Sequence, residues 1–304
     1  MNIKLILNPG SRSGRGRRLW RIWEAGLRQS GIVYDSVITR GLGDAFRASK
    51  ESHGADVIIA AGGDGTINEV LDGIMQSGNP AVRMGVLYAG TSPDFCRYHG
   101  IPTDPHQALQ RILDGNARPI DVVRIVYADA NHAMRIAHFA CGCNIGMGAS
   151  VARFANRWRR YLGDGLGTGL GVVRAFLYAR PVDLVLEIDG VKTTLAQVNN
   201  LSILKNPYIA SGLKLNVNLR ADDGRMMLVG VHGQSRTGLC RLLPGFYSGN
   251  AVDEQAVFIR ECARVNIRAK GTPEIEFDGD PRGYLPAELQ VLPRALNLIG
   301  GCHD

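Results

Sequence analysis

The chain has 304 residues, enough for two domains. Its 45% apolar and 21% charged residues are typical of a globular protein. No apolar run approaches the length of a membrane-spanning helix, and the N-terminus lacks the basic start and cleavage site of a signal peptide. The six cysteines form no C-x-x-C pair, so we expect reduced, structural cysteines in a cytoplasmic protein rather than a zinc site.

Positive charge is concentrated near the N-terminus. Residues 1–50 carry ten lysines and arginines against three acidic residues, an excess equal to the net charge of the whole chain, +7. This excess predicts an anionic partner: nucleotide phosphates, an anionic membrane surface or nucleic acid. A solvated helix face is the plainer alternative, which we prefer for Arg21 and Arg28.

The first 120 residues alternate between apolar strands and amphipathic helices. We expect strands at 3–7, 33–39, 57–61 and 83–89, and helices around Leu19–Leu27, over 44–52 and after the turn at 62–66. This alternation predicts a doubly wound, Rossmann-like parallel sheet with ligands at the C-terminal ends of its strands. Polar turns follow four of those ends, at 8–16, Thr39, 62–66 and 90–95. We therefore expect these turns to converge on one crevice.

The stretch from Ala55 to Gly73, ADVIIAAGGDGTINEVLDG, is central to the function. A short strand runs into a glycine turn, and Ile67, Val70 and Leu71 then fall on one helical face. Glycine turns at a helix N-terminus bind anions, usually phosphates. A carboxylate such as Asp64 repels a phosphate unless a metal or a proton mediates, so its presence favours catalysis over plain binding. In the alternative interpretation, Asp64 merely caps the helix.

From about residue 120 the pattern changes to short strands with few helices between them. These strands are expected at 122–127, 135–140, 184–188, 196–204, 227–232 and 263–267. The pattern is typical of an antiparallel sandwich or barrel. We expect a nucleotide-binding α/β domain over residues 1–120 and a β-sandwich domain over residues 121–290.

Two segments, 150–178 and 236–248, interrupt the second domain. The first places several arginines beside Trp158 and Tyr161 and continues into a glycine-rich run. Basic and aromatic side chains together suit a membrane interface, and a solvated helix next to a loop fits equally well.

Several common enzyme motifs are missing from the sequence. There is no G-x-x-x-x-G-K-[ST], H-E-x-x-H or G-x-S-x-G, and the seven histidines form no ligand cluster. The polar groups that remain are carboxylates in glycine turns, at Asp64, Asp94, 222–224 and 278–280. Such turns suit hard-cation chemistry on phosphates.

These residues carry a resemblance to the catalytic domain of diacylglycerol kinases, within the superfamily that includes sphingosine, ceramide and NAD kinases. The matching motifs, in chain order, are Asn8-Pro9 with Ser13-Gly14, GGDGTINEVLDGI at 62–74, GTSPDF at 90–95, Asp223-Gly224, FDGDP at 277–281 and LPRAL at 292–296. They extend over nearly the whole chain, which is most similar to the soluble bacterial lipid kinases.

The resemblance implies an ATP site in a cleft between the two domains and a closing segment, residues 291–304, that returns to the first domain. The implied ATP contacts are Asn8, Thr39, Gly62, Gly63, Asp64, Gly65, Thr66, Asn68 and Thr91. Asp280 is implied as the base that accepts the proton of the lipid hydroxyl, and Asp64 is expected to serve the metal-bound phosphates. A structural Mg²⁺ is implied at the second-domain turn, held by Asp223 and by carbonyls near Arg220 and Arg225.

We therefore expect an ATP- and Mg²⁺-dependent lipid kinase that phosphorylates the hydroxyl of a membrane lipid such as diacylglycerol. Sphingoid bases, ceramide and phosphatidylglycerol remain alternative acceptors, and an NAD kinase-like enzyme is a further alternative. A non-catalytic nucleotide- or lipid-binding protein stays open because Ser92-Pro93 replaces the family's Ala-Asn and Asp280 replaces its usual Glu.

The expected partner is a lipid surface. We expect peripheral membrane association in the cytoplasm, with a homodimer possible. No nucleic-acid partner is expected, because the arginines do not interleave with aromatic residues in a recognisable module.

Overall fold

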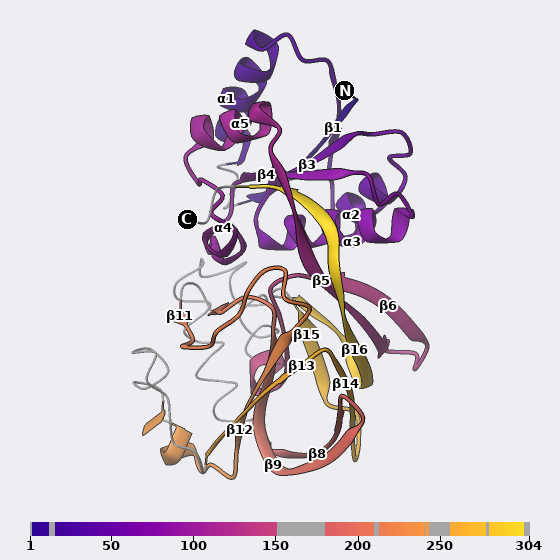
Figure 1. The fold of residues 1–304 in the computed structure, drawn as a ribbon, viewed down its shortest axis with the longest axis vertical. Helices are drawn as coiled ribbons and strands as arrows, with labels where there is room; N and C mark the ends of the chain where they lie inside the picture. The colour runs from indigo at the N-terminus through magenta and orange to yellow at the C-terminus, as the bar shows by residue number, and fades with distance from the viewer. Residues whose placement is uncertain are drawn as a thin grey trace.

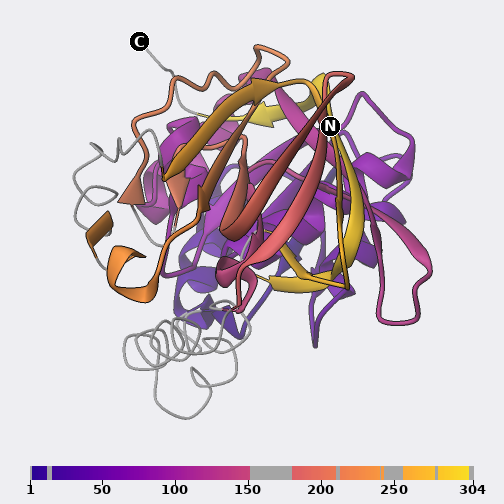
Figure 2. The ribbon, with the colours of Figure 1, turned by 90° about the horizontal axis from the view of Figure 1, so that it is seen from below.

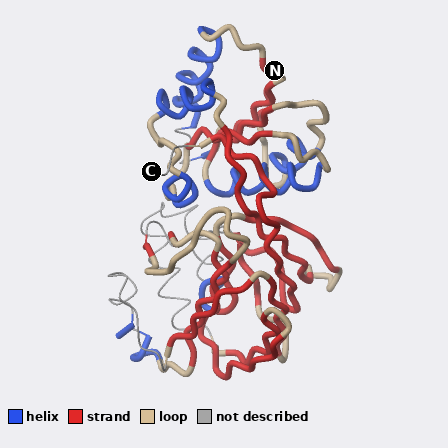
Figure 3. Tube along the Cα trace, in the orientation of Figure 1, coloured by secondary structure: helices blue, strands red, loops and turns tan. Residues whose placement is uncertain are grey.

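The computed structural model describes residues 2–11, 16–150, 180–209, 213–239, 241–242, 256–277 and 280–300. Helices gather in one half of the molecule and most strands in the other, with long strands running between the two halves (Figures 1 and 3). Most of the expected interruption at 150–178, with Trp158 and Tyr161, lies outside the described residues, as does much of the one at 236–248.

The N-terminal half is a mixed α/β domain. Its elements are β1 (Ile3–Leu7), α1 (Gly16–Gln29), β2 (Tyr34–Ile38), α2 (Asp44–Lys50), β3 (Val57–Gly62), α3 (Asp64–Ser77), β4 (Arg83–Tyr88), α4 (Asp94–His99) and α5 (Pro105–Asp114). The four strands are parallel, in the order β2-β1-β3-β4. Their C-terminal ends therefore meet at one edge of the sheet, where ligands bind in open α/β sheets.

Alternating side chains of the central strands pack against helices on both faces of this sheet. On one face Ile58 and Ala60 share a core with residues of α2 and α3. On the other, Val57 and Ile59 pack with Trp23 of α1 and with apolar residues of α5. Successive strand side chains point to opposite faces, so a strand covered on both sides reads as a continuous apolar run. This is why β3, with all six residues buried, is so clear in the sequence.

Close packing of α2 against α3 fixes the helix that carries the glycine turn. Gly73 lies at their contact, and a Cβ there would come within 1.8 Å of Ser49 Oγ and 2.5 Å of Phe46 O. Ser49 is fully buried and bonds back to Ala45 O at 2.9 Å. Only glycine allows the two helices this approach. The contact therefore fixes where the first turn of α3 lies relative to the sheet.

The C-terminal half is β-rich. Its elements are β5 (Ala117–Ala128), β6 (Met134–Phe139), β7 (Gly142–Gly146), β8 (Val182–Ile188), β9 (Val191–Leu204), β10 (Tyr208–Ile209), β11 (Leu213–Lys214), β12 (Met226–His232), β13 (Val257–Cys262), β14 (Arg264–Ala269), β15 (Glu274–Phe277) and β16 (Asp280–Ile299). Strand pairing runs β16-β14-β8-β9-β7-β15 and back to β16. These antiparallel pairs make a closed circuit around an apolar core, seen from below in Figure 2.

Two long strands connect the halves. β5 pairs antiparallel with β16 from Ala117 to Ala128, and both run from one half of the molecule into the other (Figure 1). At its far end β16 pairs parallel with β4 through Asn297 and Leu298. The chain thus re-enters the first domain near its C-terminus. The limits expected for the two domains and the closing segment stay predictions.

No helix within the described ranges is both long and apolar enough to cross a membrane. The cysteines that the structure describes, Cys96, Cys141, Cys143 and Cys262, are free thiols.

Candidate active site

A pocket of about 720 Å³ lies where β1, β2 and β3 end. Its lining residues are Asn8, Pro9, Gly10, Ser11, Arg17, Thr39, Arg40, Gly41, Leu42, Ala45, Gly63, Gly65, Thr66 and Glu69. Three of the four turns expected to converge therefore do so, and five of the expected ATP contacts line this pocket: Asn8, Thr39, Gly63, Gly65 and Thr66.

Hydrogen bonds join the turns to one another. Asn8 Oδ1 accepts from Gly10 N at 3.0 Å, which bends the first turn, and Asn8 Nδ2 donates to Thr66 Oγ1 at 3.0 Å. Thr39 N donates to Leu7 O at 2.8 Å. Asn8 thus links the end of β1 to the first turn of α3, although 58 residues separate it from Thr66. The pocket wall is held in place by the protein before any ligand binds.

The N-terminus of α3 opens into this pocket. Gly63 is the N-cap residue and no side chain caps the helix. A Cβ on Gly62 would lie 2.5 Å from Thr66 Oγ1, so the turn requires glycine there. A Cβ on Gly63 would come within 3.2 Å of the Gly90 Cα, which places the turn after β4 directly against the turn after β3. Backbone N–H groups at an uncapped helix start, with the positive end of the helix dipole, bind anions such as phosphate.

Asp64 stands in the first turn of α3, beside the pocket. Its Oδ2 accepts a hydrogen bond from the Tyr88 hydroxyl at 3.1 Å. Burial raises the pKa of Tyr88, and the charge of Asp64 raises it further. Burial and the same charge raise the pKa of the Cys96 thiol. Both neighbours therefore stay neutral, and neither cancels the negative charge of Asp64.

The sequence reasoning missed part of the pocket wall. Arg40, Leu42 and Glu69 were not expected to line it, although Arg40 directly follows Thr39 and Glu69 belongs to the glycine motif. Glu69 Oε1 accepts from Gly43 N at 2.8 Å and so supports the turn after β2. From this turn only Thr39 was predicted to contact ATP. The sequence does not show how the turn folds back over α3.

Asp44 stabilises the same turn. Its Oδ2 accepts from Arg40 N at 2.7 Å and from Gly41 N at 3.0 Å. The bond from Arg40 N is the main reason that the pKa of Asp44 lies below its usual range. The two arginines that line the pocket, Arg17 and Arg40, give it a basic wall suited to phosphate.

Four expected ATP contacts lie outside the lining of this pocket. Gly62 and Asp64 adjoin it in sequence, whereas Thr91 is exposed after β4. Asn68 is 3% exposed and its Nδ2 donates to His138 O at 3.2 Å, which connects α3 to β6. Nearby, Asp72 Oδ1 and His138 Nδ1 lie 2.9 Å apart and make a second link between these elements. The structure thus shows Asn68 joining α3 to the β-rich half, and its contact with ATP stays a prediction.

Asp280, the expected general base, is the first residue of β16 and its backbone pairs with Phe277. Asp278 lies outside the described residues. Close by in sequence, Glu276 is 5% exposed and accepts from Asn144 Nδ2 at 2.7 Å. Asn144 in turn accepts from Ser202 Oγ at 2.7 Å, so a largely buried polar chain joins β15, the strand that precedes Asp280, to β7 and β9. The sequence reasoning did not find this chain.

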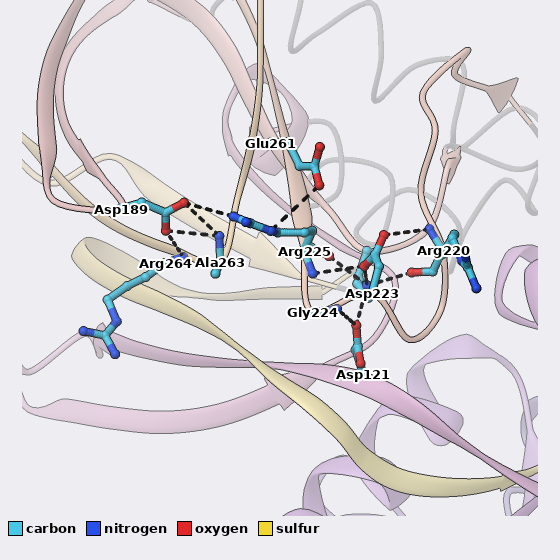
Figure 4. A network of polar contacts seen from close by, with 10 residues as sticks. Asp121, Asp189, Arg220, Asp223, Gly224, Arg225, Glu261, Ala263 and Arg264 are labelled. Atoms are coloured by element: carbon cyan, nitrogen blue, oxygen red, sulfur yellow. Dashed lines mark hydrogen bonds and ion pairs between the residues drawn. The ribbon is translucent and has the colours of Figure 1, made fainter.

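The turn expected to hold a structural Mg²⁺ brings its three residues together around one point (Figure 4). That point is occupied by the ammonium group of Lys205. Its Nζ lies 2.7 Å from Arg220 O, from Asp223 Oδ1 and from Arg225 O. Asp121 Oδ2 also lies 2.7 Å from Nζ. Neither Lys205 nor Asp121 was expected at this turn.

A magnesium ion does not fit this turn together with Lys205. Mg²⁺ holds its oxygen ligands at about 2.0–2.1 Å, whereas 2.7 Å is an ordinary distance for a charged N–H···O bond. The side chain of Lys205 is 1% exposed and that of Asp121 is fully buried. Within the described part of the chain, no group of three or more His, Cys, Asp or Glu side chains is placed to hold a metal. The expectation of a structural Mg²⁺ at Asp223 therefore disagrees with the structure.

Comparisons with known proteins agree with this architecture. The family described as "Diacylglycerol kinase catalytic domain" matches residues 2–125, and the "YegS C-terminal NAD kinase beta sandwich-like domain" matches residues 142–300. A diacylglycerol kinase from Bacillus subtilis is 27% identical, over 97% of this chain and 95% of its own length. One from Mycobacterium tuberculosis is 26% identical, over 99% of this chain and 96% of its own length.

Solved structures share the fold. A diacylglycerol kinase structure from Bacillus anthracis superimposes with a TM-score of 0.70 at 18% identity, over 99% of this chain and 97% of that one. Yeast NADH kinase, complexed with NADH, superimposes with a TM-score of 0.58 at 10% identity, over 99% and 84% of the two chains. The family matches over both halves thus agree with the glycine turn at the start of α3 and with the β-rich second half. The chain belongs to the diacylglycerol kinase catalytic-domain family and is an enzyme of the lipid kinase class.

Proposed function

We propose that this enzyme transfers the γ-phosphoryl group of ATP to the hydroxyl of a membrane lipid, with diacylglycerol as the first candidate. The observation that carries the proposal is the pocket at the ends of β1, β2 and β3, into which the uncapped start of α3 opens. Phosphoryl transfer depends mainly on positioning and on neutralising charge, and this pocket offers backbone N–H groups and a basic wall for both.

In this proposal each part of the pocket has a separate task. The backbone of the Gly63–Thr66 turn binds the phosphates, and Arg17 and Arg40 offset their negative charge. Mg²⁺, brought with ATP, would be held at Asp64 and would neutralise charge on the transferred group. Asp64 suits this task because it is a carboxylate in the first turn of α3, next to the residues that line the pocket.

Asp280 is proposed as the general base. A lipid alcohol is a poor nucleophile at neutral pH, so a carboxylate within hydrogen-bond reach accepts its proton as the oxygen attacks phosphorus. A bond forms between the lipid oxygen and the γ-phosphorus, the bond from that phosphorus to the bridging oxygen breaks, and ADP leaves with the electron pair. Support comes from the position of Asp280 in the motif and from its strand, β16, which runs into the nucleotide domain.

We further propose that the enzyme works at a membrane surface in the cytoplasm as a peripheral protein. The positive excess of the first fifty residues supports this, because basic segments bind anionic lipid headgroups. The homodimer named as possible stays a prediction.

The deciding experiment supplies radiolabelled ATP and Mg²⁺ to the enzyme with a panel of acceptors in mixed micelles. The panel contains diacylglycerol, ceramide, a sphingoid base and phosphatidylglycerol, with NAD as a soluble acceptor in a parallel reaction. We expect label in phosphatidic acid, and label in another lipid product would keep the lipid kinase and change the acceptor. Label only in the product from NAD would contradict the proposal. ATP binding without any labelled product would favour the non-catalytic alternative.

A further inference from the structure

Lys205 is a buried lysine at the junction of the two halves of the molecule. It directly follows β9, and its own N–H and that of Asn206 both donate to Cys141 O, at 2.8 and 3.1 Å. Asn206 Nδ2 donates to Asp94 O of α4 at 3.0 Å, so the residue next to Lys205 contacts the nucleotide domain. Hydrogen bonds to Cys141 and to Asp94 therefore fix the backbone that carries this ammonium.

The oxygens around the ammonium come from separate parts of the chain. Asp121 belongs to β5, one of the two strands that join the halves, while Asp223 lies in the turn before β12. The remaining two oxygens are the carbonyls of Arg220 and Arg225, which flank Asp223. Gly224 has a φ of 72°, a conformation that favours glycine, and this lets the turn fold both carbonyls toward one point. Such an inward-facing set of carboxylates and carbonyls is what a hard cation requires.

The remaining capacity of both carboxylates is taken up by backbone N–H groups. Asp121 accepts from Gly224 N at 2.7 Å and from Arg294 N of β16 at 2.8 Å. Asp223 accepts from Arg220 N at 3.1 Å and from Arg225 N at 3.0 Å. Burial acts to raise the pKa of Asp223, but the bonds from Lys205 and Arg225 outweigh it and lower that pKa. Each acid thus contacts two backbone N–H groups and the same internal cation.

We propose that Lys205 takes the place of a structural metal ion in this enzyme, so that the Asp223-Gly224 turn and its attachment to β5 and β16 need no divalent cation. The carboxylate of Asp121 is fully buried and that of Asp223 is 23% exposed beside it. A buried carboxylate without a cation is strongly unfavourable, so something positive must occupy this point. The ammonium meets that need at 2.7 Å from all four oxygens. For the residues that the structure describes, the divalent cation that remains to be bound is then the one that accompanies ATP.

The first test uses wild-type protein without nucleotide. Thermal unfolding is followed in EDTA and in about 10 mM MgCl₂, since a ligand that binds only the folded state raises Tm. Binding of Mn²⁺ is measured by electron paramagnetic resonance, with Asp223→Asn as the reference. We expect equal Tm in both solutions and no Mn²⁺ signal that depends on Asp223. Mn²⁺ bound to wild type and lost in Asp223→Asn would overturn the proposal, and this holds whether or not the enzyme is a lipid kinase.

The second test removes the ammonium group of Lys205 from between the four oxygens. Lys205→Ala leaves four oxygens without a cation, so we expect a lower Tm in EDTA and a partial recovery in MgCl₂. Lys205→Met keeps an apolar chain in the same space, so its Tm is lowered without a response to Mg²⁺. Lys50→Ala is the matched control, because this half-buried lysine donates to Gln76 rather than to a carboxylate.

Three outcomes of this second test are decisive. A Lys205→Ala protein that folds only with Mg²⁺ supports the proposal. One that equals wild type in EDTA, or that responds to Mg²⁺ no more than Lys205→Met does, contradicts it. If Lys205→Ala does not fold in either solution, the measurements on wild type decide alone.

Discussion

The chain contains two Asp-Gly turns that look alike in sequence and differ in surroundings. Asp64-Gly65 begins α3 beside an open pocket, and its carboxylate has a tyrosine hydroxyl at 3.1 Å. Asp223-Gly224 precedes β12 and encloses the ammonium of Lys205 at 2.7 Å. The first carboxylate accepts a hydrogen bond from a neutral hydroxyl. The second turn is closed around a cation that belongs to the chain.

The difference separates binding from architecture. Asp64 lies at the positive end of the α3 dipole beside a pocket, where a ligand can approach it. The charge of Asp223 is neutralised within the protein by the buried Lys205, so we expect this carboxylate to stabilise the fold rather than to take part in the reaction. We therefore expect the surroundings of each Asp-Gly turn, rather than its motif, to decide whether it takes part in catalysis.

The largest expected effect is that removing the charge of each aspartate affects a different property: catalysis for Asp64 and stability for Asp223. Asp64→Asn is expected to lower kcat by orders of magnitude and leave Tm nearly unchanged, because the carboxylate serves bound phosphates and not the fold. Asp223→Asn is expected to keep kcat near wild type in folded protein and to lower stability by about 2 kcal/mol, a typical value for a bond to a charged group. Steady-state kinetics and thermal unfolding of both variants check this. Near-normal turnover in Asp64→Asn would reject its catalytic role.

Asp280 sharpens the comparison by adding a third carboxylate. If it accepts the lipid proton, Asp280→Asn loses nearly all activity with ATP affinity intact. Asp280→Glu extends the side chain by roughly 1.5 Å and is expected to retain part of the activity. Turnover and ATP binding by calorimetry separate the two effects. Wild-type turnover in Asp280→Asn would place the base elsewhere, and Asp278 would be the next candidate.

Most of the first domain could be predicted from the sequence because its signals are local. Strand β1 was expected at 3–7 and is found there, and β4 was expected at 83–89 and ends one residue earlier. The short helices α4 and α5 were missed, although Asp104 caps α5 through the N–H groups of His106 and Gln107. In the second half the expected strand at 122–127 misses the first five residues of β5 and its last one. Its first residues, Ala117–Pro119, are at least partly exposed and give no apolar pattern, and they are strand because β16 pairs with them.

The candidate site could be predicted only where it lies within a motif. The turn at Gly63–Thr66 was found because strand, glycine and helix signals are adjacent in the chain. Lys205 was not, since a lone lysine after an apolar strand gives no sign of its partners. It pairs with Asp223, 18 residues later, and with Asp121, which is farther still along the chain. Such a contact depends on how β9 and β5 are brought together, which one sequence does not show.

Added salt should affect the basic residues of the N-terminal segment and the ion pairs of Lys205 differently. If the basic residues of the N-terminal segment bind anionic lipid, added anionic lipid raises activity several-fold and salt lowers it, because exposed charges are screened within about 10 Å at 0.1 M salt. The ion pair between Lys205 and the fully buried Asp121 is screened far less. The difference in Tm between wild type and Lys205→Met is therefore expected to stay constant over the same salt range. Vesicle assays and unfolding curves measure the two responses, and activity indifferent to both salt and anionic lipid would contradict surface binding.

The smallest expected effect is the loss of the stability contributed by Asp223 at acid pH, which is confined to a narrow pH range. The pKa of Asp223 is lowered in the folded protein, so the folded state binds its proton less readily than the unfolded state, whose value is about 3.9. The stability that Asp223 contributes is therefore fully present above about pH 5 and is lost as pH falls through its folded pKa. Unfolding by urea of wild type and Asp223→Asn, from pH 7 down to pH 3, measures that contribution as the difference between the two.

That difference is expected to be constant from pH 7 to about pH 5 and to shrink below about pH 4, where protonated aspartic acid and asparagine become alike. Asp44→Asn is a suitable comparison, because the pKa of Asp44 is also lowered but by backbone N–H groups at an exposed turn. Its smaller difference should fade over the same range. A difference that did not shrink below about pH 4 would contradict the stabilising role of the ionised Asp223 carboxylate.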